Sequence, residues 1–180
     1  MNELKRFRAL FASMALASAL AACGGGGVAS SGAALTPQEQ IAQLEASGAL
    51  PTLDRTDSIA GIDANANGVR DDIERYIEKK YTVAPERAAA MQTGRALQQT
   101  LLVDKTDAVK LEEVSKAGVR AAKCRGLVFS GLERFPEAYA MSRDIEAMTT
   151  NTKGRLLAYL AYNKAVSGTV SQLPKGDSCE

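Results

Sequence analysis

Apolar residues recur every three or four positions along the chain from residue 36 onward, which is the spacing of one face of a helix. No stretch alternates apolar and polar residues in the manner of a half-buried strand. We therefore predict an all-α fold, a small compact helical domain of five or six helices over residues 36–180. The predicted helices cover about 37–47, 69–80, 84–104, 107–130, 136–148 and 153–166, and the predicted irregular segments are 49–62 and 169–180.

The ends of these segments carry helix start and stop signals. Thr36 can cap the first helix, Pro37 suits its first position, and Glu39 completes a capping box. Gly48 is suited to end that helix. The apolar rhythm also predicts which side chains of the last two helices are packed: Ala138, Tyr139, Ile145 and Met148 in the fifth, and Leu156, Leu157, Tyr159 and Leu160 in the sixth.

Residues 1–22 have the organisation of a secretion signal. Three basic residues precede an apolar stretch over 9–20, which is shorter than the ~20 residues that span a bilayer as a helix. The stretch ends in Leu20-Ala21-Ala22-Cys23, which resembles the lipobox of bacterial lipoproteins. The resemblance implies that the signal is removed and that Cys23 is acylated. An ordinary secretory signal cut near Ala22 and an uncleaved anchor helix are the alternatives.

Residues 23–35 follow as a run rich in Gly, Ser and Ala, which predicts a flexible tether before the domain. Attachment to the cell-envelope membrane through the acyl chains on Cys23 is implied by the lipoprotein resemblance. An Asp after the acylated cysteine resembles an inner-membrane retention signal, and position 24 is Gly. In a Gram-negative host the resemblance therefore implies the outer membrane, on the periplasmic side.

The composition excludes several classes of function. The chain has 22 Lys+Arg, 21 Asp+Glu and no histidine, and it lacks tryptophan. A balanced charge argues against a general nucleic-acid binder, and the lack of histidine excludes Ser-His-Asp triads and HExxH zinc sites. Removal of 1–22 takes away three basic residues and one acidic residue, which changes the formal charge from +1 to −1. Charge alone would therefore not hold the domain on anionic lipid.

Two cysteines remain after Cys23 is assigned to lipid. Cys124 and Cys179 form an even pair in an oxidising compartment, which predicts a disulfide that joins the C-terminal segment to the fourth helix. The alternative is a buried free thiol at Cys124 and an exposed one at Cys179. Catalysis by either thiol is disfavoured because the chain has no histidine to act as its base.

The segment 63–74 is the one motif with recognisable chemistry. Its positions 1, 3, 5, 6, 9 and 12 match an EF-hand calcium loop, which the segment resembles. The resemblance implies one structural Ca²⁺ site, in which Val69 offers its backbone carbonyl. The implied ligands are Asp63, Asn65, Asn67, Val69, Asp71 and Glu74.

Two features depart from a paired EF-hand. Arg70 occupies position 8, where paired loops carry an aliphatic residue, and no entering helix or second loop is evident. The loop is more similar to the solitary calcium loops of dockerins and thrombospondin type 3 repeats. The alternative is an Asx-rich turn that caps the following helix, since acidic residues favour a helix N-terminus.

These observations lead to three functional expectations. The first is a non-enzymatic, calcium-binding, lipid-anchored envelope protein that binds or scaffolds a protein partner. The second is a lipid-anchored inhibitor or immunity protein against an envelope toxin. The third, a hydrolase that uses paired carboxylates, stays open because a sequence does not show distances between acidic groups.

Overall fold

The computed structural model describes residues 34–180, so the predictions for the signal segment, Cys23 and most of the tether lie outside it. The described chain forms six α-helices and no strand, which confirms the all-α prediction. The helices are α1 (Pro37–Ala46), α2 (Asp71–Lys80), α3 (Ala84–Leu102), α4 (Ala108–Val128), α5 (Phe135–Thr149) and α6 (Lys153–Ala165).

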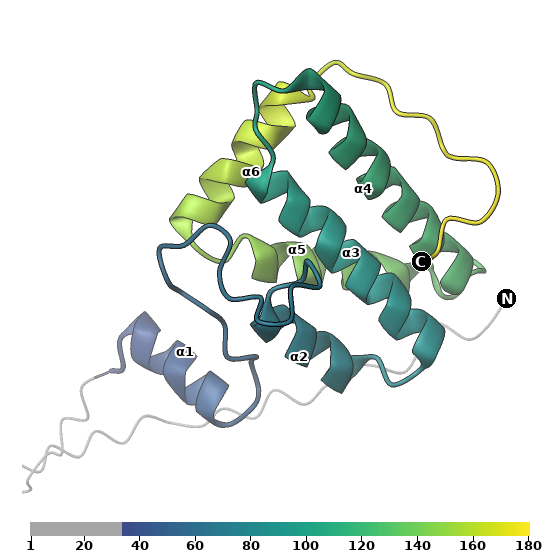
Figure 1. Ribbon diagram of the computed structural model, residues 1–180. Helices are drawn as coiled ribbons and strands as arrows, with labels where there is room; N and C mark the ends of the chain where they lie inside the picture. The colour runs from purple at the N-terminus through teal and green to yellow at the C-terminus, as the bar shows by residue number, and fades with distance from the viewer. Residues whose placement is uncertain (1–33) are drawn as a thin grey trace, which may run out of the picture. The chain divides into compact units, whose positions relative to one another are not determined.

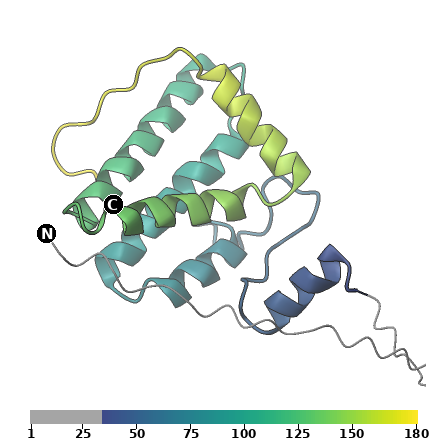
Figure 2. The ribbon, with the colours of Figure 1, turned by 180° about the vertical axis from the view of Figure 1, so that it is seen from behind.

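Helix α3 is the centre of the arrangement, because α2, α4, α5 and α6 all pack against it. Figure 1 shows α4 running beside α3, with α6 across their upper ends. In Figure 2, which shows the domain from behind, α5 lies in front of α3. Helix α1 lies to one side of the other five and contains no buried residue. The long central helix thus supplies the surface on which the domain is built.

The apolar core divides into two clusters. The larger one joins α2, α3 and α5, and its fully buried members include Ile73, Ile77, Met141 and Ile145. The smaller one joins α4 and α6 through Leu111, Val114 and Tyr162. Residues Thr36–Glu180 form one unit that contains both clusters and all six helices. This unit therefore has a complete core of its own.

The predicted helix starts are largely confirmed. Thr36 and Glu39 form the capping box of α1, and Thr152 caps α6 by accepting a hydrogen bond from the amide of Arg155. Helix α2 begins at Asp71, two residues later than predicted, because Arg70 has an extended backbone with ψ of 135° and serves as the N-cap.

The predicted packing of α5 and α6 is partly wrong. Tyr139 is 60% exposed, and the three leucines of α6 are 44% to 55% exposed. Arg155 and Tyr162, seven residues apart on one face of α6, are buried in their place. The spacing of apolar residues correctly predicted a helix, but the face that contains Arg155 is buried and the face with the leucines is exposed. The leucines are Leu156, Leu157 and Leu160.

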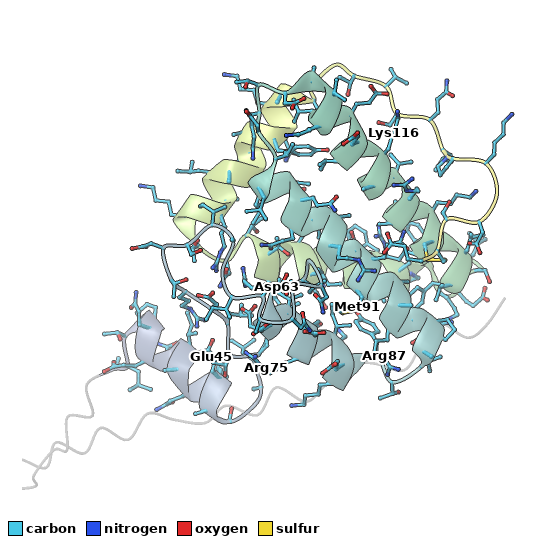
Figure 3. All side chains as sticks on the ribbon, in the orientation of Figure 1. Glu45, Asp63, Arg75, Arg87, Met91 and Lys116 are labelled. Atoms are coloured by element: carbon cyan, nitrogen blue, oxygen red, sulfur yellow. A yellow bond between two sulfur atoms is a disulfide. The ribbon has the colours of Figure 1, made fainter. Side chains whose placement is uncertain are left out.

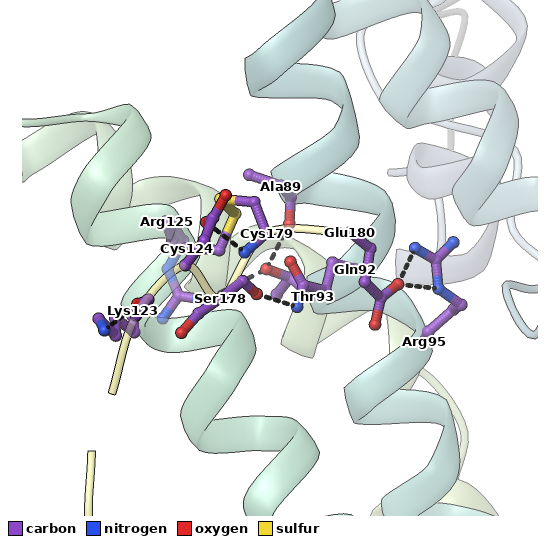
Figure 4. The surroundings of a disulfide bond; sticks show 12 residues. Ala89, Gln92, Thr93, Arg95, Lys123, Cys124, Arg125, Ser178, Cys179 and Glu180 are labelled. Carbon is purple, nitrogen blue, oxygen red and sulfur yellow. Dashed lines mark hydrogen bonds and ion pairs between the residues drawn. A yellow bond between two sulfur atoms is a disulfide. The ribbon is translucent and has the colours of Figure 1, made fainter. Parts of the chain in front are cut away.

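The C-terminal segment has no helix, as predicted, and its end is fixed to α4 and α3. Cys124 and Cys179 form a disulfide with their Cα atoms 4.9 Å apart, which confirms the predicted pair. Figure 4 shows the surrounding contacts, in which the Gln92 side chain donates to the carbonyl of Ser178 at 2.8 Å and Arg95 pairs with Glu180. The terminal residues are therefore part of the folded domain.

None of the helices between residues 34 and 180 combines the length and the apolar composition needed to cross a membrane.

Replacing both Cys124 and Cys179 by alanine is expected to lower the free energy of unfolding by about 4 kcal/mol. The reason is that the disulfide closes a loop with a sequence separation of 55 and so restricts the unfolded chain. Urea unfolding followed by circular dichroism measures the loss, and the helical signal of the native state should persist. A loss below about 1 kcal/mol would show that the bridge does not constrain the unfolded chain in this way.

Candidate calcium-binding loop

The first half of the loop curls around the side chain of Asp63. Its Oδ1 accepts a hydrogen bond from the amide of Asn67 at 3.1 Å, and its Oδ2 accepts one from the amide of Gly68 at 2.8 Å. Gly68 has φ of 81°, a conformation that a residue with a side chain rarely adopts. Gly68 stands at position 6 of the motif, where an EF-hand loop turns sharply, and the chain turns there. Asp63 itself lies in the segment that precedes α2 (Figure 3).

In the second half of the loop, Glu74, in the first turn of α2, lies close to the side chains of Asn65 and Asn67. The side-chain amide of Asn67 donates to Glu74 Oε1 at 2.7 Å, and that of Asn65 donates to Oε2 at 3.1 Å. Residues at positions 3, 5 and 12 of the motif thus converge, although nine residues separate the first from the last. These hydrogen bonds bring the two ends of the segment 63–74 together.

The remaining two predicted ligands, Asp71 and Val69, lie on the same loop and make hydrogen bonds to other loop residues. The Oδ1 atom of Asp71 accepts the amide of Ala64 at 3.0 Å, which ties the two halves of the loop together. Val69 is fully buried, and its amide donates to Oδ1 of Asn67 at 2.8 Å. The described residues contain no group of three or more Cys, Asp or Glu side chains that could hold a metal ion. Any cation here would depend on the amide oxygens of the two asparagines as well.

The residue that departs from the motif, Arg70, is among the most buried side chains of the domain, with 0% exposure. Its Nε donates to Oδ1 of Asp72 at 2.6 Å and its Nη2 to Oδ2 at 2.8 Å. A further bond from Nη2 reaches the carbonyl of Met148 at the end of α5, at 2.9 Å. A buried guanidinium thus joins the start of α2 to the end of α5.

A second buried arginine, Arg155 of α6, holds the irregular segment that enters the loop. Its Nη1 donates to the carbonyl of Asp54, and its Nη2 donates to the carbonyl of Ser58 at 2.9 Å. The amide of Asp54 in turn donates to Oδ2 of Asp72 at 2.7 Å. The two arginines and two aspartates therefore form one network that fixes residues 54–58 against α2 and α6.

The burial of this network and its charges shift the pKa values of Asp54 and Arg155. Burial raises the pKa of Asp54, but hydrogen bonds from Thr56 and the charges of Arg155 and Arg70 outweigh it, so the pKa lies below its usual value. Burial, together with the nearby charge of Arg70, lowers the pKa of Arg155 against the opposing effect of Asp54. Because the pKa of Asp54 is lowered on folding, its contribution to stability is lost as pH falls through that value.

Glycine is required where the chain passes over Arg70. Gly61 has φ of 69°, and a Cβ atom at this position would overlap the Arg70 side chain. The segment before the loop is therefore shaped by the buried arginine and not by an entering helix.

Sequence reasoning did not identify this network. The one signal was Arg70 itself, which stands at a position where the motif normally has an aliphatic residue. Asp72 is expected from the sequence only as one of the acidic residues at the start of a helix. The spacing of Asp54, Asp72 and Arg155 gives no sign that they meet.

No protein-family model, curated protein or solved structure matches this chain.

Substituting Arg70 by leucine is expected to cost about 3–5 kcal/mol, because Asp72 would be left as a buried, unpaired carboxylate. Urea unfolding at neutral pH measures the change in free energy. Arg75→Leu is the matched control, since Arg75 lies exposed on α2, which Arg70 precedes, and it should change stability by no more than about 0.5 kcal/mol. Equal effects of the two substitutions would contradict the role assigned to Arg70.

Proposed function

We propose that the protein is a calcium-binding, lipid-anchored protein of the bacterial cell envelope, which is not an enzyme and works by binding or scaffolding a protein partner. The observation that supports this proposal most is the convergence of Asn65 and Asn67 on the carboxylate of Glu74. Asp63 closes the other side of the same loop through the amides of residues 67 and 68.

The chemistry of the loop suits Ca²⁺. The ion prefers six to eight hard oxygen ligands, supplied by carboxylates, amide carbonyls, backbone carbonyls and water. Both oxygens of Glu74 accept hydrogen bonds from the side-chain amides of Asn65 and Asn67, and a divalent cation would replace these donors with a stronger positive charge once the two amides turn their oxygens toward it. The other ligands would be Asp63, Asn65, Asn67, Asp71 and the carbonyl of Val69.

The ion would have a local role. Protein groups already hold the segment before the loop, through Arg70 and Arg155. Bound calcium would instead add stability to the outer side of the loop, where Asn65 is exposed. We therefore propose a structural ion whose effect is seen as resistance to unfolding.

Attachment to the membrane is proposed through Cys23, with the following residues as a tether. The lipobox Leu20-Ala21-Ala22-Cys23 supports this part of the proposal. Gly24, which stands where an Asp would resemble an inner-membrane retention signal, supports the outer membrane, on the periplasmic side, in a Gram-negative host.

Binding of a protein partner is supported by the surface of α6. Its three leucines lie together on one side of the helix and are 44% to 55% exposed, and adjacent apolar side chains on a surface mark interaction sites. A non-enzymatic role is supported by the composition and by the disulfide, which leaves neither Cys124 nor Cys179 as a free nucleophile. The three leucines are Leu156, Leu157 and Leu160.

Calcium at about 100 times its dissociation constant should stabilise the domain of residues 36–180 by about 2.7 kcal/mol relative to EDTA. That gain corresponds to a rise in the melting temperature of about 5 to 10 °C for a domain of this size. Thermal unfolding in EDTA, in calcium and in magnesium measures it. Magnesium should have a smaller effect because it requires a tighter octahedral site.

The calcium response should disappear in the double variant Asp63→Asn/Glu74→Gln, which keeps the size of both side chains and removes their charge. The matched control is Asp57→Asn/Glu78→Gln, which removes two exposed carboxylates outside the loop and should respond as the wild type does. No response of the wild type to calcium would reduce the loop to a helix cap. Retention of the response in the loop variant would place the ion elsewhere.

Labelling with an alkyne palmitate in a bacterial host tests the anchor. The wild-type chain is expected to incorporate the label and to sediment with membranes, whereas Cys23→Ser should do neither because the thiol is the acyl acceptor. Cys124→Ser serves as the cysteine-matched control and should keep the label. Labelling that survives Cys23→Ser would contradict the lipoprotein assignment.

A further inference from the structure

Two adjoining hollows lie along α4 and α5. One, of about 490 Å³, is lined mainly by small and aromatic side chains. The other, of about 230 Å³, has a more polar lining that includes Thr93, Glu146 and Tyr159. Arg125 and Ser142 line both, so they stand where the two hollows meet. The first volume is within the range of about 300–1,000 Å³ that is common for small-molecule sites.

Among the described residues, no anion pairs with the guanidinium of Arg125. Its side chain is partly buried, and its one hydrogen bond runs from Nη1 to Oγ1 of Thr93 at 3.2 Å (Figure 4). Within residues 34–180 it makes no ion pair, whereas the partly buried Arg95 and Arg134 pair with Glu180 and Glu86. Burial lowers the pKa of Arg125, because its charge is poorly solvated. A guanidinium in this condition gains most from an added anion.

The lining of the larger hollow favours an anion that carries a large apolar group. Arg125 is the only charged residue in its lining. A bound peptide would bring backbone amides and carbonyls for which the lining has few hydrogen-bond partners, and burying them unpaired is costly. An alkyl chain brings none. The rim is itself apolar and open, since Leu132 is 93% and Phe135 is 65% exposed.

We propose that this groove binds a long-chain carboxylate such as a fatty acid. The carboxylate lies against Arg125 and Ser142, and the alkyl chain lies over the larger hollow between α4 and the start of α5. Glu146 lines only the smaller hollow, beside the hydroxyl of Tyr159, and its charge keeps the anionic head from moving deeper. This site is separate from the calcium loop and does not depend on it.

Gly126 offers a way to block the groove without damaging the fold. It lines the larger hollow in the last turns of α4, and a Cβ atom added there would meet no atom within 4 Å. A leucine at this position would occupy the space proposed for the alkyl chain. Leucine also favours the helical backbone over glycine, so the variant should fold at least as well as the wild type.

The test is isothermal titration of the domain of residues 36–180 with laurate and with dodecylammonium, each below its micelle concentration. The two amphiphiles have the same chain length and opposite head charge. Laurate should bind and dodecylammonium should bind at least tenfold more weakly. Arg125→Gln should weaken laurate binding by about 10- to 100-fold, as expected for loss of a charge-assisted hydrogen bond, and should remove the preference for the anion. Gly126→Leu should abolish binding of laurate.

Arg120→Gln is the matched control, because Arg120 is an exposed arginine of the same helix outside both hollows, and it should leave laurate binding unchanged. Melting temperatures of all variants should stay close to that of the wild type, which separates loss of binding from loss of fold. Equal affinity for the two amphiphiles, or unchanged laurate binding in Gly126→Leu, would overturn the proposal. Binding to phosphatidylglycerol vesicles without binding of free laurate would also overturn it and would assign the apolar rim to a membrane surface.

Discussion

The structure depends on two buried arginines that must be neutralised away from water. Removing a guanidinium from water costs several kcal/mol unless carboxylates and carbonyls replace the lost hydration. Asp72 does this for Arg70. The carboxylate of Asp54, 3.3 Å from Nη2, and the carbonyls of Asp54 and Ser58 do it for Arg155. Because these partners come from the irregular segment and from α2, satisfying the charges fixes how the segment crosses the domain. Helices far apart in the sequence are held together by the same bonds.

The candidate calcium loop gains its rigid base from this network. Arg70 and Asp72 lie within the twelve-residue motif itself, so the half of the loop nearest α2 is anchored in the core. The other half, from Asp63 to Asn67, projects outward and is held by its own Asx turns and by Glu74. An ion bound at the outer side, which is held only by hydrogen bonds within the loop, would add stability where the core supplies none.

Helix α4 links the remaining features. Cys124 ties the end of the chain to it, and Lys123 donates to the carbonyls of Pro174 and Gly176 in the same segment. Arg125 follows directly, and Gly126 comes one residue later in the proposed lipid groove. The disulfide thus fixes the helix at the point where the proposed ligand would meet it. The candidate calcium loop leads into α2, whereas the proposed groove is lined by α4 and α5 of the same domain.

The helices could be predicted from the sequence, because the spacing of apolar residues and the caps at Thr36 and Thr152 are local properties of the chain. The sequence also predicted the loop and the disulfide pair, since motif spacing and cysteine count need no tertiary information. The buried face of α6 could not be predicted in this way, because it depends on which side of the helix the neighbouring helices cover. Tertiary structure likewise brought together Asp54, Asp72 and Arg155, as pairing of distant charges depends on how the helices pack.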